Sequence, residues 1–245
     1  MPALPGDGGD LVQGVPFDTF LSWFKDVWQP GEHMALVGPT GEGKSTFAGH
    51  ILSQRKYVMA YDAKGGDSTL ASFGFTRVSS WPMPKKILED IAEGRDARIN
   101  LGVPIHYKQD WLVNRGLLSR AIDQVFADGG WTEYWDEYQL STDRKMVYKF
   151  GSKSEEHLIA ARDKKLSVVT SFQAPAWVPS AATRQSTWIA CWRTRDEDVI
   201  KSLARKFGRP WREFKPIVEN LPKYHVLVGG RDPFEPLVLT SVPKL

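Results

Sequence analysis

A glycine-rich octet holds the residues best suited to chemistry in this chain of 245 amino acids. It spells Gly-Pro-Thr-Gly-Glu-Gly-Lys-Ser and fits the pattern G-x-x-x-x-G-K-[ST], in which backbone N–H groups surround phosphate oxygens. The lysine would place a positive charge beside the β- and γ-phosphates, and the serine hydroxyl is a ligand for Mg²⁺. We therefore expect ATP and Mg²⁺ to bind at Gly38, Pro39, Thr40, Gly41, Glu42, Gly43, Lys44, Ser45 and Thr46.

The flanking sequence predicts the elements that must position this loop. Residues 34–37 form a short apolar run typical of a buried strand, and residues 45–53 have the apolar spacing of a helix. The order of strand, glycine loop and helix distinguishes a phosphate-binding loop from a chance glycine-rich turn.

Hydrolysis of a triphosphate also requires carboxylates near the loop. Asp136 and Glu137 follow residues 131–135, which we predict to be a strand although Thr132 and Glu133 interrupt its apolar pattern. Asp136 would hold Mg²⁺, and Glu137 would orient the attacking water. An exposed acidic pair on a loop is the alternative interpretation.

Other polar residues could act on the triphosphate besides Lys44. Gln173 ends the apolar segment 166–172, where it could sense the γ-phosphate or simply end a strand with a hydrogen bond. Arg162 precedes that segment, and an arginine can stabilise transition-state charge from the same chain or from a neighbouring subunit. Arg184 is a second candidate for this role. Because most arginines on helix surfaces have no such function, sequence position alone leaves both open.

Composition narrows the class of protein. Hydrophobic residues make up 42% of the chain, enough for a large core, and no apolar run approaches the roughly 18 residues of a membrane helix. The single cysteine, Cys191, can form no intramolecular disulfide and argues against a structural zinc site. Residues 1–14 lack the basic and apolar segments of a secretory signal. We therefore expect a soluble cytoplasmic protein with no membrane partner.

Strand and helix patterns alternate along the chain, which predicts an α/β fold with a mainly parallel sheet covered by helices on both faces. Residues 1–14 are rich in Gly, Pro and Asp and are expected to form a flexible tail, followed by a single domain over residues 15–245. The expected helices span residues 17–28, 45–53, 111–126, 154–164 and 196–207, and the expected strands span 34–37, 57–61, 97–101, 131–135, 166–172, 187–192, 224–228 and 237–239.

Charge is distributed unevenly. Residues 1–137 hold 13 Lys and Arg against 18 Asp and Glu, a net charge of −5, whereas residues 138–245 hold 19 against 11, a net charge of +8. Within the second part, residues 141–153 interleave cations with aromatic side chains, a pattern that suits contact with a nucleic-acid backbone. An ordinary basic surface loop is the alternative. The cations of this segment are Arg144, Lys145, Lys149 and Lys153.

The order of these motifs resembles that of the FtsK/HerA-type ATPases, a branch of the additional-strand P-loop ATPases. The resemblance covers residues 32–230 and rests on the octet, on residues 61–65, on Asp136-Glu137-Tyr138 and on Gln173-Ala174-Pro175. The single-domain form is most similar to the genome-packaging ATPases of double-stranded DNA viruses and phages.

That resemblance implies a RecA-like (ASCE) P-loop NTPase fold and a motor that hydrolyses ATP to translocate double-stranded DNA. It implies a homomeric ring, a pentamer or hexamer, with active sites between subunits, so that Arg162 would act in trans. Residues 141–153 would then face DNA in the pore. A portal or capsid protein is a further expected partner, and a viral protein would act in the host cytoplasm. The polar Walker B strand and the lack of an additional nuclease-like domain depart from the family pattern.

Three alternatives belong to other functional classes. Asp62-Ala63-Lys64-Gly65 spells the D-x-x-G of GTPases, but it follows Lys44 by only 18 residues, and no N-K-x-D motif occurs. A small-molecule kinase with a P-loop could use Asp62 to bind a substrate hydroxyl, although the pair Asp136 and Glu137 suits water activation better. The third alternative is a protein that binds ATP only to assemble with a partner.

Overall fold

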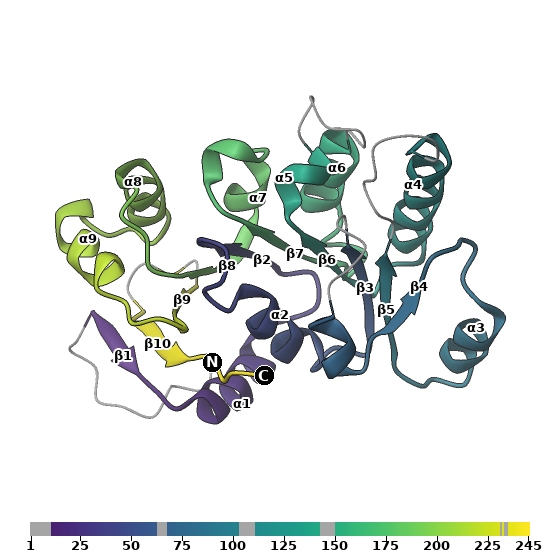
Figure 1. The fold of residues 1–245 in the computed structure, drawn as a ribbon, viewed down its shortest axis with the longest axis horizontal. Helices are drawn as coiled ribbons and strands as arrows, with labels where there is room; N and C mark the ends of the chain where they lie inside the picture. The colour runs from purple at the N-terminus through teal and green to yellow at the C-terminus, as the bar shows by residue number, and fades with distance from the viewer. Residues whose placement is uncertain (1–10, 63–67, 103–110, 143–149, 231, 233–234) are drawn as a thin grey trace.

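A computed structural model describes residues 11–62, 68–102, 111–142, 150–230, 232 and 235–245 (Figure 1). A ten-stranded sheet runs through the molecule in the order β1-β10-β9-β8-β2-β7-β6-β3-β5-β4. Its strands are β1 (Val12–Gly14), β2 (His33–Val37), β3 (Tyr57–Asp62), β4 (Thr76–Val78), β5 (Ala97–Gly102), β6 (Thr132–Asp136), β7 (Ser167–Phe172), β8 (Ser186–Cys191), β9 (His225–Gly229) and β10 (Leu237–Ser241). β9 is antiparallel to both neighbours, and the other pairings are parallel. The expected mainly parallel sheet is confirmed.

Helices cover both faces of this sheet, as expected (Figure 1). The helices are α1 (Phe17–Val27), α2 (Lys44–Leu52), α3 (Lys85–Ala92), α4 (Trp111–Asp128), α5 (Tyr138–Thr142), α6 (Gly151–Ala160), α7 (Ala181–Arg184), α8 (Glu197–Lys206) and α9 (Trp211–Glu219). The buried side chains of α1 and α2 share one core, and those of α3 to α9 belong to the core on the opposite face. None of the described helices is long and apolar enough to cross a membrane.

Alternate side chains of the central strands face these two cores. In β2, Met34 and Leu36 pack toward α1 and α2, whereas Ala35 and Val37 pack toward the helices on the other face. All residues of β2 are buried, as expected for a parallel strand with helices on both sides. The strand that leads into the glycine octet is therefore fixed in the middle of the sheet.

The aromatic face of α1 packs on α2. Phe20 and Phe24 are fully buried, and the ring of Phe20 lies 5.7 Å from that of Phe47, centroid to centroid. This contact follows from the apolar spacing of residues 17–28, and it anchors the helix that begins at Lys44, within the octet.

The expectation of a flexible tail needs correction over its last residues. Residues 12–14 form β1, which pairs in parallel with β10, and the backbone N–H of Val15 donates to the carbonyl of Leu239 at 2.9 Å. Backbone pairing with a partner more than 200 residues away in sequence fixes this segment, which its Gly-rich surroundings conceal. Residues 1–10 of the predicted tail lie outside the described residues.

Candidate nucleotide-binding site

The glycine octet connects β2 to α2, in the expected place. Gly41 and Gly43 have φ angles of +82° and +97°, in the left-handed region that residues with a side chain rarely adopt. A Cβ at Gly38 would lie 2.8 Å from the Cβ of Trp192, so only glycine fits there. These positions explain why the octet needs its glycines and why its backbone can curve around an anion.

Lys44 begins α2 and is held within the octet. Its Nζ donates to the carbonyl oxygens of Gly38 and Pro39, at 2.7 and 2.8 Å. The residue is buried, and the positive end of the α2 dipole adds to its charge. The octet therefore combines a cation, glycines that allow a tight backbone turn, and a helix N-terminus. Together these features suit a phosphate group.

Asp136 and Glu137 lie at the end of β6, at the same edge of the sheet as the octet. Because β2, β6 and β7 are parallel, their carboxyl ends meet at this edge, which we call the carboxyl edge. Asp136 is buried, and one of its carboxylate oxygens accepts a hydrogen bond from the hydroxyl of Tyr134 at 3.0 Å. Glu137 has a φ of +47°, and such strained conformations of non-glycine residues concentrate at functional sites.

The polar residues that interrupt the apolar pattern of β6 have partners inside the core. The fully buried carboxylate of Glu133 accepts hydrogen bonds from the hydroxyl of Tyr61 at 2.7 Å and from the indole of Trp135 at 3.3 Å, and it lies 2.9 Å from Nδ1 of His157. Burial alone would lower the pKa of His157, but the charge of Glu133 and the hydrogen bond to it raise that pKa overall. β6 is therefore a buried central strand despite its polar residues.

β7 separates the strand that carries the octet from the strand that carries the carboxylates. It pairs with β2 on one side and with β6 on the other. Gln173 follows its last residue, and the side-chain Nε2 donates to the hydroxyl of Thr40 at 3.2 Å. A strand in this position is the additional strand in the name of the family that the sequence resembles. The fold is that of a P-loop NTPase.

Solved structures share this fold. The genome packaging NTPase B204 from Sulfolobus turreted icosahedral virus 2, solved with ATP-gammaS, matches 89% of this chain and 100% of its own, with 18% identity and a TM-score of 0.59. VirB4 of Thermoanaerobacter pseudethanolicus matches 87% of this chain and 89% of its own, with 10% identity and a TM-score of 0.60. The pCW3 conjugation coupling protein TcpA matches 85% of this chain and 59% of its own, with 12% identity and a TM-score of 0.51.

Neither a protein-family model nor a curated protein matches the sequence. At these identities the likeness establishes the fold. The predicted RecA-like fold is confirmed, and the structural neighbours are of the kind that the resemblance to FtsK/HerA-type packaging ATPases implies.

Both candidate arginines lie at the other end of the strands, which we call the amino edge. Arg162 is exposed in the turn between α6 and β7, and Arg184 is the exposed last residue of α7, just before β8. β7 has six residues, so this edge is about 20 Å from the octet at roughly 3.3 Å per residue. Neither arginine can therefore reach the P-loop of its own chain, and a role in trans stays a prediction.

The predicted DNA-binding segment is described only in part. Arg144, Lys145 and Lys149 lie outside the described residues. Lys153 lies in α6, where its Nζ donates to the hydroxyl of Ser119 at 2.8 Å and to a carboxylate oxygen of Asp123 at 2.6 Å, both on α4. Because Lys153 shares its charge with Asp123, it is less suited to phosphate contact than its sequence position suggested.

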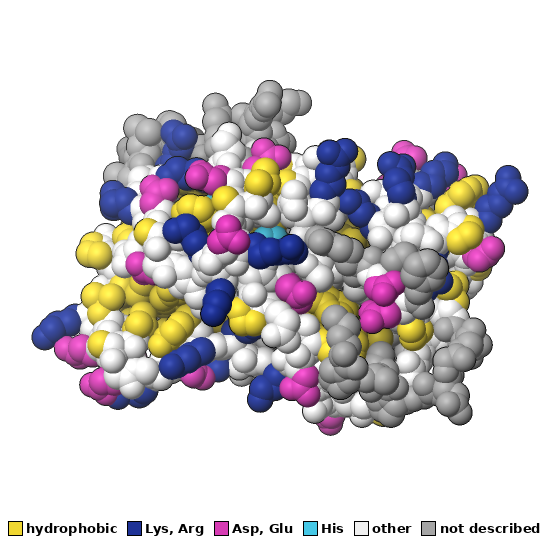
Figure 2. Space-filling view, turned by 180° about the vertical axis from the view of Figure 1, so that it is seen from behind, with side chains coloured by type: hydrophobic (Ala, Val, Ile, Leu, Met, Phe, Trp, Pro, Cys, Tyr) yellow, Lys and Arg dark blue, Asp and Glu magenta, His cyan; other side chains and the backbone are white. Residues whose placement is uncertain are grey.

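The described surface carries charges of both signs. On the face drawn in Figure 2, Lys and Arg side chains are interspersed with Asp and Glu. Among the described side chains of that face, positive charge is therefore not gathered into one patch.

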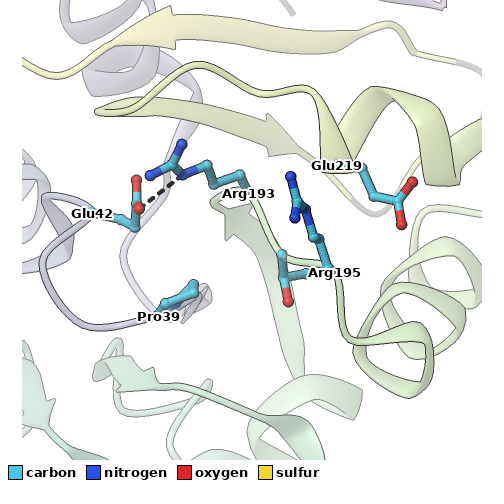
Figure 3. A pocket seen from close by; sticks show the side chains of 6 residues that line it. Pro39, Glu42, Arg193, Arg195 and Glu219 are labelled. Atoms are coloured by element: carbon cyan, nitrogen blue, oxygen red, sulfur yellow. Dashed lines mark hydrogen bonds and ion pairs between the residues drawn. The ribbon is translucent and has the colours of Figure 1, made fainter.

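The structure brings one further group to the octet. Arg193, Thr194 and Arg195 follow β8 and lie beside Pro39 and Glu42 at the carboxyl edge (Figure 3). Sequence reasoning missed them, although one signal was present: they directly follow an apolar segment, as Gln173 does. What the sequence does not reveal is that β8 is the other neighbour of β2.

Proposed function

We propose that this protein is an ATPase that drives the translocation of double-stranded DNA, as a genome-packaging motor would. The fold supports a P-loop motor, since the solved relatives are described as a genome packaging NTPase and as a conjugation coupling protein. Assembly into a homomeric pentamer or hexamer, a portal or capsid partner, and action in the cytoplasm of a host cell are parts of the same proposal.

The residues of the site fit a magnesium-bound triphosphate. Gly41 and Gly43 give the octet the curvature that a phosphate needs, and Lys44 lies buried within it. The Ser45 hydroxyl and the Asp136 carboxylate are oxygen ligands of the kind that Mg²⁺ accepts. When bound, ATP supplies the phosphoanhydride bond whose hydrolysis provides the free energy for movement.

Each catalytic step has a residue of this chain suited to it. The carboxylate of Glu137 accepts a hydrogen bond from the attacking water and takes up its proton. Lys44 and the backbone N–H groups of the octet stabilise the negative charge that develops on the transferred phosphoryl group. Gln173 contacts Thr40, so it can transmit a change in the octet to β7.

The observation that carries the proposal is the shared edge of β2, β7 and β6. It brings together the octet, Gln173 and the pair Asp136 and Glu137. A kinase would instead need a group that can hold a substrate hydroxyl, and Asp62, the candidate for that role, is only 2% exposed. The arrangement therefore favours attack by water over transfer to a substrate.

The rate of ATP turnover with and without long double-stranded DNA, at two salt concentrations, tests the proposal. We expect DNA to stimulate turnover about tenfold and the stimulation to fall as salt rises, because phosphate contacts release counterions.

Lys44→Ala should abolish turnover in both conditions. Lys145→Glu combined with Lys149→Glu should reduce the stimulation more than the turnover without DNA. Turnover that ignores DNA, or that requires a small-molecule acceptor, would contradict the proposal.

A further inference from the structure

A pocket of about 350 Å³ lies between the octet and the loop that follows β8 (Figure 3). Its lining comes from the octet, from the loop after β8 and from the end of α9. The lining residues are Pro39, Glu42, Arg193, Thr194, Arg195 and Glu219. The pocket therefore places two arginines beside a loop whose proposed ligand is a polyanion.

The two arginines differ in their contacts. Nε of Arg193 donates to Oε1 of Glu42 at 2.9 Å, and the side chain of Arg193 keeps 44% of its surface exposed. Arg195 lines the same pocket, yet it forms no ion pair among the described residues and points between Arg193 and Glu219 in Figure 3. Only Arg193 is therefore bonded to the octet.

Glu42 is an unusual residue for its place. Its side chain is 9% exposed, and its second carboxylate oxygen, Oε2, is buried and has no hydrogen-bond partner among the residues that the structure describes. A buried carboxylate with a single partner is costly to maintain, and a negative charge within a phosphate-binding loop repels the phosphate. Among the described residues, Arg193 is the group that forms an ion pair with Glu42 and so offsets this charge.

We propose that Arg193 is a positioning residue of the nucleotide site, which acts in cis by neutralising Glu42 and so sets the affinity of the octet for polyphosphates. The inference rests on the proposed function. It assigns a role at the carboxyl edge to an arginine of the same chain, separate from the role in trans predicted for Arg162. β8 pairs with β2, so the loop that holds Arg193 is attached to the strand that leads into the octet.

The effect of Arg193 should depend on the charge of the nucleotide. Without its cation, Glu42 repels each phosphate, so the loss of affinity should grow from AMP to ADP to ATP. We expect Arg193→Ala to raise the Kd for ATP about tenfold, and the Kd for AMP less than about threefold, at low salt. If the contact only maintained the shape of the loop, the ratio of the Arg193→Ala Kd to the wild-type Kd for ATP would stay constant as salt rises, whereas repulsion by an unpaired Glu42 is screened by salt.

Arg195→Ala is the matched control. It removes the same charge from the same pocket but breaks no ion pair with the octet, so its Kd for ATP should stay within about twofold of the wild-type value. An equal loss in Arg195→Ala and Arg193→Ala would show a general effect of pocket charge and would overturn the proposal.

A second measurement isolates the charge of Glu42. In a Glu42→Gln background, the change Arg193→Ala should alter the Kd for ATP less than about twofold, because no carboxylate remains to be neutralised. The same tenfold loss in both backgrounds would overturn the proposal, even if Arg193→Ala alone behaved as expected. If the wild-type protein bound no nucleotide, the proposed function itself would fail, which separates the two results.

Discussion

The two edges of the sheet differ in whether the predicted site residues found there can act together within one chain. At the carboxyl edge, Lys44 donates back to the octet that contains it, and Gln173 and Arg193 contact the octet from the loops that follow β7 and β8, the two neighbours of β2. At the amino edge, Arg162 is exposed in the turn before β7, and Arg184 is exposed at the end of α7, just before β8. One edge therefore gathers the predicted site residues, and the other presents two arginines that lie too far away to reach the octet of their own chain.

This difference teaches what a single chain can provide. Groups that bind the nucleotide and activate water can come from one set of parallel strands, because the carboxyl ends of those strands coincide. A cation from the amino edge could serve only another copy of the chain. The comparison therefore divides the predicted catalytic residues into those that act in cis and those that require a neighbour.

The largest expected effect belongs to the amino edge. If Arg162 stabilises transition-state charge in a neighbouring site, Arg162→Ala should lower ATP turnover about a thousandfold while ATP still binds. Turnover is the measurement, and Arg184→Ala is the control from the same edge. Subunits that carry Arg162→Ala should recover activity when mixed with Glu137→Gln subunits, since one interface then has both groups intact. If mixing restored no activity, Arg162 would not contribute to a site shared between subunits.

The next effect belongs to the carboxyl edge. Glu137→Gln removes the base but keeps the shape of the side chain, so turnover should fall about a hundredfold and the Kd for ATP should change little. Single-turnover kinetics and a binding titration separate the two quantities. Equal losses in binding and turnover would mean that Glu137 holds the nucleotide rather than the water.

The smallest effect lies between the edges, in the buried contact of Glu133 with His157. Because the pKa of His157 is raised above its ordinary value of 6.5, the contact stabilises the fold below about pH 6.5 and loses its contribution as the pH rises through the raised pKa. The melting temperature should therefore fall as the pH rises above about 6.5. His157→Gln should flatten that slope and cost about 2 kcal/mol of unfolding free energy at pH 6.5.

His50→Gln is the control for this slope. Burial lowers the pKa of His50 and outweighs the charge of Asp18, so its titration affects stability only below about pH 6.5. The loss above that pH should persist in this variant. A slope that is unchanged in His157→Gln would contradict the assignment.

Much of the fold could be predicted from local patterns. The segments that form β2, β3, β7 and β8 are apolar runs, and α8 has apolar residues at helical spacing. The local sequence therefore predicts each of these elements. α9 was not predicted, because Pro216 interrupts it; burial of Phe214 and Val218 maintains the helix despite the proline. β1 was missed because three residues give no usable pattern, and only its pairing with β10 defines it.

The site was predictable to the extent that it follows single strands. The octet, Asp136 and Gln173 each end an apolar segment, and parallel strands place such ends together. Arg193 was not predicted, because its position beside the octet follows from the pairing of β8 with β2, which the sequence does not reveal. Glu133 interrupts the apolar pattern of β6, and the sequence does not reveal its partners, because Tyr61 and His157 are distant along the chain. Only their packing makes a buried carboxylate acceptable.

The pairing of β1 with β10 bears on how this protein should be produced. The first 14 residues look dispensable, and an expression clone would commonly omit them. Without β1, the five-residue strand β10 would become the outermost strand, with a row of open backbone donors and acceptors. An exposed strand edge of this kind can pair with a strand of another molecule. A protein trimmed of β1 should therefore aggregate through the edge of β10, which three residues cover in the intact chain.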